Sequence, residues 1–258
     1  MKQLVCKSID ENAHKIITLA KDIESCPELG YKEIKTSEKV CNFMKELNLK
    51  YRNGLALTGV KASLKEKSQG PNIAILGELD GVICFDSPNA NKETGASHTC
   101  GHNLQIAAML GAALGLKLSG IENNLCGNVT FMAVPSEEYI EIEYRNKLRE
   151  EGKIHFLAGK QELIYRGEFD DIDIAMMFHS LKNCPTPTVA IGDSSNGFLG
   201  KTVQYTGKAA HAAEAPHDGI NALNAAMLGI MGINALRETF RDEDSIRVHP
   251  IITKGGDT

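Results

Sequence analysis

The chain has 258 residues, a formal net charge of −5 and 42% hydrophobic residues, which are ordinary values for a soluble globular protein. This charge provides no basic surface for nucleic acid, and no apolar run is long enough to span a membrane. The length suits one large domain or two smaller ones.

The seven cysteines are odd in number and scattered, and the N-terminal residues lack the apolar core of a signal peptide. We therefore expect reduced thiols in a cytoplasmic protein. Cys100 alone lies in a context typical of a metal ligand. We expect packing roles for Cys26, Cys41, Cys84, Cys126 and Cys184.

Apolar residues at helical spacing predict a first helix over about residues 8–25 and a second around 40–47, with Thr36 or Ser37 as a possible cap. Further helices are expected over about 104–118 and 144–165. Apolar runs predict strands near residues 51–57, 60–64, 73–76, 129–134 and 175–178.

The alternation of strands and helices predicts an α/β fold with a mixed, largely parallel sheet flanked by helices. In open sheets of this kind, ligands gather at the carboxyl ends of the strands. Asp80, Glu137, Glu138 and His179 all follow such ends. The long stretch 81–97 is expected to be a functional loop over the same site.

Glycines 192, 197 and 200 indicate a linker, so we expect a catalytic domain over residues 1–195 and a second domain over 196–258. A strand over 201–206, a helix over 220–240 and a strand over 246–253 would give the second domain an α+β fold. Since so few elements form a marginal core, we expect this domain to be incomplete.

The most informative stretch is His98-Thr99-Cys100-Gly101-His102-Asn103-Leu104. A thiolate and an imidazole two residues apart suit zinc, manganese or cobalt better than calcium or magnesium. Gly101 allows the backbone turn that would point both side chains at one ion. An inert buried cysteine beside a hydrogen-bonded core histidine is the alternative.

Two further strand ends carry compatible residues, the pair Glu137-Glu138 and His179. Adjacent carboxylates at a strand end are costly unless one binds a cation or their protonation states differ. A solvated glutamate pair or a surface histidine would be ordinary in isolation. Their occurrence together with the Cys100 motif favours one shared metal site.

These motifs together resemble the di-metal amidohydrolase and aminoacylase family, which includes p-aminobenzoyl-glutamate hydrolase, auxin-conjugate hydrolases and related carboxypeptidases. The resemblance covers nearly the whole chain and implies a zinc-exopeptidase-like fold with a ferredoxin-like lid or dimerisation domain. Its motifs, in family order, are Pro27-Glu28-Leu29-Gly30-Tyr31, Gly77-Glu78-Leu79-Asp80, the Cys100 motif, Pro135-Ser136-Glu137-Glu138, Phe178-His179, the segment 207–213 and Gly219-Ile220-Asn221-Ala222-Leu223.

The resemblance implies a role for each matching residue. Glu137 would be the general base, Asp80 the acid that orients a ligand, and His211 the group that polarises the substrate carbonyl. Asn221 would help to bind the substrate carboxylate. The implied metal ligands are Cys100, His102, Glu138 and His179.

The implied reaction is hydrolysis of an amide bond in an N-acyl or N-aroyl amino acid or a dipeptide, by a homodimer. The family holds two divalent ions per site, zinc or manganese, with cobalt as a third candidate. This chain departs from the commonest pattern at Glu78, where others have Asp or His, and at Asn103, where many have Asp.

The family also supplies a further histidine ligand from a C-terminal segment, and none of the eight histidines present is a convincing substitute. The competing hypothesis is therefore an inactive fragment or a metal-binding protein without catalysis. A thiol enzyme that uses Cys100 is a third reading, although Cys100 lacks a Cys-x-x-Cys partner.

Overall fold

The computed structural model describes residues 1–65, 70–181, 189, 191–192 and 197–256. The chain divides into two compact units, Met1–Cys184 and Pro185–Thr258. The boundary expected between residues 195 and 196 lies outside the described residues. Each unit is considered by itself.

The N-terminal segment forms two helices where one was predicted, α1 (Lys2–Glu11) and α2 (Ala13–Glu24). The break falls at Asn12, whose backbone leaves the helical region at φ −113° and ψ 13°. The Asn12 amide donates to the Ser8 carbonyl, a local bond that competes with continuation of the helix.

The next helix, α3, spans Ile34–Glu46. Its N-cap residue is Glu33, so neither Thr36 nor Ser37 caps it. The carboxylate of Glu28 instead accepts from the backbone N–H groups of Lys35 and Thr36. A carboxylate seven residues upstream thus satisfies the first-turn donors, a partner that local spacing does not reveal.

The five strands predicted in the first unit all form and make one mixed sheet in the order β1-β2-β6-β3-β7. β3 pairs with β6 and β7 in parallel, whereas β2 pairs with β1 and β6 antiparallel. The strands are β1 (Lys50–Leu55), β2 (Gly59–Ser63), β3 (Asn72–Glu78), β6 (Asn128–Val134) and β7 (Ile174–Met177).

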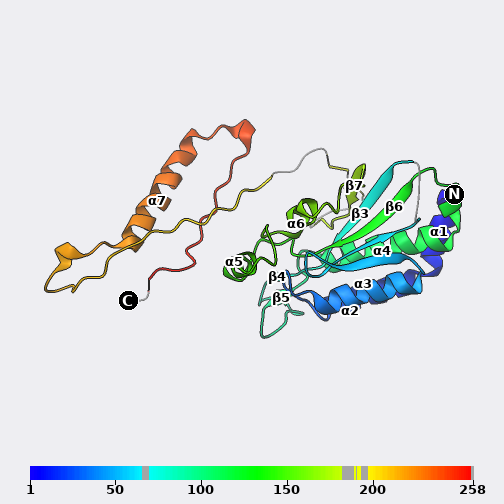
Figure 1. The fold of residues 1–258 in the computed structure, drawn as a ribbon, viewed down its shortest axis with the longest axis horizontal. Helices are drawn as coiled ribbons and strands as arrows, with labels where there is room; N and C mark the ends of the chain where they lie inside the picture. Colours follow the sequence, from blue (N-terminus) through cyan, green and yellow to red (C-terminus); the bar gives the residue numbers. More distant parts are fainter. Residues whose placement is uncertain (66–69, 182–188, 190, 193–196, 257–258) are drawn as a thin grey trace. The chain divides into compact units, whose positions relative to one another are not determined.

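Helices cover both faces of this sheet (Figure 1). On one face, Phe131 and Val60 pack with residues of α3 and of α4 (His102–Leu118), including Leu110. On the other face, Ala74 and Met132 pack against residues 148–163. The alternation along β3 and β6 therefore builds a three-layer α/β/α unit.

The segment 144–165, predicted as one helix, forms α5 (Ile142–Glu150) and α6 (Gly159–Tyr165). Gly152 has φ +70°, which ends α5. The buried carboxylate of Glu162 then accepts from the N–H groups of His155 and Phe156 and fixes the connecting loop. The loop 81–97 contains a small hairpin of β4 (Val82–Ile83) and β5 (Ala96–Ser97), and η1 (Ile121–Asn124) follows α4.

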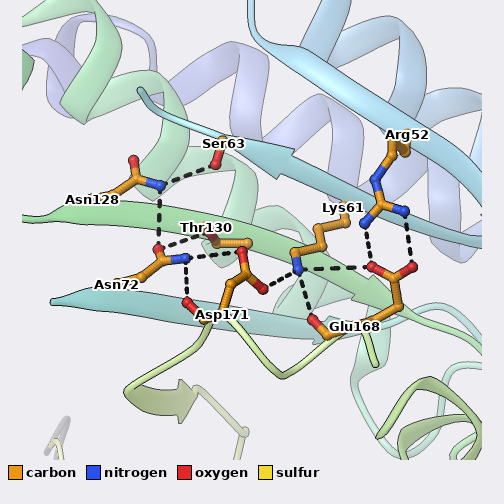
Figure 2. A network of polar contacts seen from close by, with 8 residues as sticks. All are labelled: Arg52, Lys61, Ser63, Asn72, Asn128, Thr130, Glu168 and Asp171. Atoms are coloured by element: carbon orange, nitrogen blue, oxygen red, sulfur yellow. Dashed lines mark hydrogen bonds and ion pairs between the residues drawn. The ribbon is translucent and has the colours of Figure 1, made fainter. Parts of the chain in front are cut away.

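A polar network that includes residues of β1, β2, β3 and β6 ties the segment before β7 to the sheet (Figure 2). Lys61 donates to Asp171 at 2.6 Å and to the Glu168 carbonyl at 2.7 Å. Arg52 forms a two-point ion pair with the Glu168 carboxylate. This network fixes the start of β7 and therefore the position at which the chain reaches His179.

The second unit contains α7 (Ala222–Leu236), which lies inside the predicted range, and the short 3₁₀ turns η2 (Pro216–Asp218), η3 (Arg237–Thr239) and η4 (Asp242–Asp244). The strands expected over 201–206 and 246–253 do not form. Among the described residues of this unit, the only β pairing is an isolated bridge between Lys208 and Ile220. A strand requires a ladder partner, and sequence alternation alone does not supply one.

Among the described residues, none of the helices has both the length and the apolar character needed to cross a bilayer.

The core predicts a contrast between two leucines of the same helix. Leu110 is fully buried, whereas Leu118 at the end of α4 is 55% exposed. Leu110→Ala should lower the free energy of unfolding by about 2–5 kcal/mol, because it leaves a cavity. Leu118→Ala should change it by less than about 0.5 kcal/mol. Urea unfolding followed by circular dichroism checks both values, and equal effects would contradict this packing.

Candidate metal centre

Side chains from four segments converge at the carboxyl ends of the parallel strands. Asp80 follows β3, Glu137 and Glu138 follow β6, and His179 follows β7. The Cys100–His102 turn enters α4 at the same edge. Parallel strands end together, so residues far apart in sequence meet here, as the strand-end pattern predicted.

The imidazole of His102 is buried and held in one orientation. Its Nδ1 lies 2.8 Å from the backbone carbonyl of Asp80, an acceptor, so this nitrogen carries the proton. Nε2 is therefore the nitrogen that faces the site and that could bind a metal ion in place of a proton. This nitrogen is buried and has no hydrogen-bond partner in the described part of the chain. Oε2 of Glu78 lies 3.1 Å from it.

The thiol of Cys100 faces His179. The Sγ atom lies 3.5 Å from Nε2 of His179, whose Nδ1 donates to the Ser180 carbonyl at 2.8 Å. Gly101 between the two motif ligands has φ +88°, and a Cβ built there would lie 2.3 Å from the Ser180 hydroxyl. Glycine therefore allows both the turn and the close approach of the segment after β7.

Ligand atoms of Cys100, His102 and His179 all lie within 4.8 Å of one another, and so do those of Glu78, His102 and Glu137. His102 belongs to both groups. A soft thiolate, imidazole nitrogens and carboxylates form a donor set suited to zinc or manganese, so the residues present fit the predicted metal.

Asp80 lies beneath the site and contacts both His102 and Glu138. It is fully buried, and its Oδ2 accepts from the backbone N–H of Glu138 at 2.9 Å. Its Oδ1 lies 3.5 Å from Nδ1 of His102. Asp80 thus contacts two of the predicted ligands, His102 through its backbone carbonyl and Glu138 through its carboxylate.

The turn before the glutamate pair has a strained backbone at Ser136. Hydrogen bonds from Ser136 to Glu33 and from Gly159 to Ser136 hold it in place, and we call these contacts the brace. Ser136 has φ +51° and is fully buried. Its N–H donates to the carboxylate of Glu33 at 2.6 Å, and its carbonyl accepts from Gly159 at 3.0 Å. A Cβ on Gly159 would lie 1.7 Å from the Pro135 carbonyl, so only glycine fits there. The brace fixes where Glu137 and Glu138 leave the strand.

Negative charge dominates the site. Burial, together with the nearby Glu138, raises the pKa of the Cys100 thiol to about 12. Burial and the charge of Glu78 likewise raise the pKa of Glu137. For His102, burial opposes the charged form, but hydrogen bonding to Asp80 and the charge of Glu78 outweigh it and raise the pKa to about 9. All three shifts express a shortage of positive charge, which a bound cation would supply.

Two predicted site residues belong to the second unit. Nδ1 of His211 accepts from the backbone N–H groups of Ala213 and Glu214, at 3.2 and 3.1 Å. Oδ1 of Asn221 accepts from the Asn224 N–H at 2.8 Å and caps α7. These local bonds define their immediate surroundings, and their predicted catalytic and substrate-binding roles stay predictions.

Two residues that were given no role lie in the centre. Glu78 is 1% exposed and forms an ion pair with Lys160, whose Nζ also lies 3.7 Å from Glu137. Glu78 stood out in the sequence as a departure from the commonest pattern. Lys160 could not be identified from the sequence, because it lies inside the predicted helix 144–165 and no motif indicates that its side chain faces the site.

Known proteins with similar sequences are hydrolases of small amino acid derivatives. The chain is 31% identical to the mouse Xaa-Arg dipeptidase over 99% of its own length and 54% of that protein's. It is 28% identical to the N-acetyl-L-cysteine deacetylase of Bacillus subtilis over 86% of its own length and 50% of that protein's. The chain therefore spans about half the length of these curated relatives. No protein-family model matches it.

A similar fold occurs in the Bacillus subtilis YXEP protein, described as a dinuclear metal binding peptidase from the M20 family. The TM-score is 0.53 and the sequence identity 25%, over 66% of this chain and 43% of the other. Both the sequence relatives and this solved structure agree with the resemblance inferred from the motifs.

The brace predicts a pH dependence of stability. Burial, helped by the charge of Asp80, raises the pKa of Glu33 from 4.5 to about 7. The folded chain then holds this proton more tightly than the unfolded chain. Stabilisation by the proton is complete below pH 4.5 and is lost as pH rises through about 7.

Glu33→Gln should remove this part of the pH dependence, since glutamine does not titrate. Urea unfolding with a chelator present, at several pH values between 4 and 8, measures the difference between variant and parent. A difference that does not change with pH would contradict the raised pKa. Glu151→Gln, at an exposed position, serves as the control.

Proposed function

We propose that this chain belongs to the di-metal amidohydrolase and peptidase family of these relatives, and that it hydrolyses an amide bond in an N-acyl or N-aroyl amino acid or a dipeptide. The observation that carries the proposal is the meeting of Cys100, His102 and His179 at one sheet edge, with ligand atoms within 4.8 Å of one another. Glu137 and Glu138 lie beside them.

We propose that Cys100, His102, Glu138 and His179 hold a divalent metal, zinc or manganese, with two ions in the whole protein. When bound, the metal supplies a water of low pKa as the nucleophile and a positive charge for the developing oxyanion. The Asp80 carbonyl fixes the tautomer of His102, and the Asp80 carboxylate fixes the backbone of Glu138.

Glu137 is the proposed general base. Its side chain is 33% exposed, so it can meet both water and substrate. In this role Glu137 would accept the water's proton and pass it to the leaving amine. His211, on the second unit, is the proposed donor to the substrate carbonyl, and Asn221 the proposed partner of the substrate carboxylate.

We also propose a homodimer and a reducing compartment such as the cytoplasm. The helix α7 carries exposed apolar side chains, including Met227, Leu228 and Met231, which a partner surface would bury. A metal-binding Cys100 thiolate is lost when it oxidises, so a reducing compartment preserves the site.

The competing functions are a metal-binding protein without catalysis and a thiol enzyme. The raised pKa of Cys100 argues against a free nucleophilic thiolate, because such enzymes lower that pKa. Turnover of N-acyl amino acids separates catalysis from metal binding alone.

Replacement of Cys100 tests the site. The parent, loaded with Mn²⁺ or Zn²⁺ and desalted, should retain about one or two equivalents per chain, and Cys100→Ser should lose most of them because the alkoxide needed for ligation does not form. Metal analysis by mass spectrometry measures this, with Cys126→Ser as the matched control. Equal retention in the two variants would overturn the assignment of Cys100.

Replacement of Glu137 tests the mechanism. Glu137→Gln should lower kcat on an N-acyl amino acid by about 10²–10⁴-fold while the metal content stays at the parent value, because a base is lost but no ligand. A hydrolysis assay and metal analysis on the same samples give both quantities. Loss of metal together with activity would instead identify Glu137 as a ligand.

A further inference from the structure

Glu78 has the surroundings of a metal ligand rather than of a structural carboxylate. It stands at the last position of β3 and is 1% exposed. Its Oε2 lies 3.1 Å from Nε2 of His102, yet no hydrogen bond joins the two atoms. Nε2 of His102 and the carboxylate oxygen of Glu78 are both potential ligand atoms, and they lie close enough together for one ion to bind both.

The third member of this group is Glu137, whose ligand atom lies within 4.8 Å of those of Glu78 and His102. Burial of two carboxylates beside one imidazole is costly without a compensating charge. The buried Nε2 of His102 has no hydrogen-bond partner in the described segments, although carboxylate oxygens of Glu78 and Glu138 lie 3.1 and 3.9 Å away, and this arrangement fits a group that binds an ion.

Lys160 supplies the compensating charge in the structure. Its ammonium forms an ion pair with Oε1 of Glu78 and lies 3.7 Å from Glu137. The lysine side chain is 33% exposed, whereas that of Glu78 is 1% exposed. The ammonium therefore reaches the buried carboxylate from the solvent side, along a flexible stem that can withdraw without unpacking the core.

We propose that Glu78 is a further ligand of the bound ions and that Lys160 is the resident cation that a second ion displaces from the Glu78 carboxylate. The proposal rests on the proposed function, because it assumes that the centre binds metal. It assigns Lys160 a role as a competitor, which makes occupancy of the second position depend on metal concentration. Lys160 is a positioning residue, since it acts through Glu78.

Direct binding of Mn²⁺ to the full chain tests this, with calorimetry and competition against a chromophoric chelator as the readouts. Glu78→Gln should remove one equivalent or weaken one site by at least about tenfold. Lys160→Met should tighten the same site roughly fivefold, the contribution of one partly exposed ion pair. Lys147→Met, which removes an exposed lysine of α5, should leave binding unchanged.

A double variant separates competition for Glu78 from a general change of charge. If Lys160 acts through Glu78, Lys160→Met should give no tightening in the Glu78→Gln background. Tightening of equal size in both backgrounds would overturn the competitor role, as would tightening in Lys147→Met. Circular dichroism of each variant establishes that it is folded.

The outcomes distinguish this inference from the proposed function. If Cys100→Ser loses metal but Glu78→Gln binds like the parent, the metal centre stands and the role of Glu78 is wrong. A parent chain that binds no Mn²⁺ overturns both.

Discussion

The buried Asp80 is the constraint on which the centre depends. Its carbonyl sets the proton position on His102, and its carboxylate holds the backbone of Glu138 at 2.9 Å. Burial of a carboxylate is costly, and Asp80 is only partly compensated: Oδ2 accepts from Glu138, while Oδ1 has no hydrogen-bond partner in the described part of the chain. The two bonds that Asp80 does make, one through its carbonyl and one through its carboxylate, go to two of the predicted ligands. The end of one parallel strand thus becomes the reference point of the site.

The sequence predicted the sheet and its ends better than the helices. A strand that is buried on both faces has a continuous apolar sequence. The strands over residues 73–76 and 129–134 could therefore be predicted without tertiary information. The breaks at Asn12 and Gly152, by contrast, follow from a side-chain bond and a positive φ inside otherwise helical spacing. In the second unit, the apolar alternation was present, but no strand among the described residues pairs with it, and pairing is a tertiary property.

The sequence predicted the candidate metal ligands but not the residues that hold them in place. Cys100, His102 and the glutamate pair carry recognisable chemistry at short spacing. Glu33 and Lys160 reach the centre only through the fold, from the residue before α3 and from α6, and nothing local marks them. Asn103 shows the same limit: it is a departure in the motif, and in the structure its amide donates to the Ala20 carbonyl and ties α4 to α2. Residues that act through long-range contacts are invisible to spacing arguments.

Charge explains why these supports are present. Three glutamates, an aspartate and a thiol lie at one sheet edge, and their mutual repulsion favours protonation or a counter-charge. Lys160, whose side chain is 33% exposed, supplies that counter-charge to Glu78. Backbone N–H groups instead serve Asp80 and Glu33. A backbone donor cannot leave its carboxylate without a change of the fold, whereas an ammonium at the end of a flexible stem can. The proposed exchange at Glu78 would therefore leave the geometry of the sheet edge unchanged.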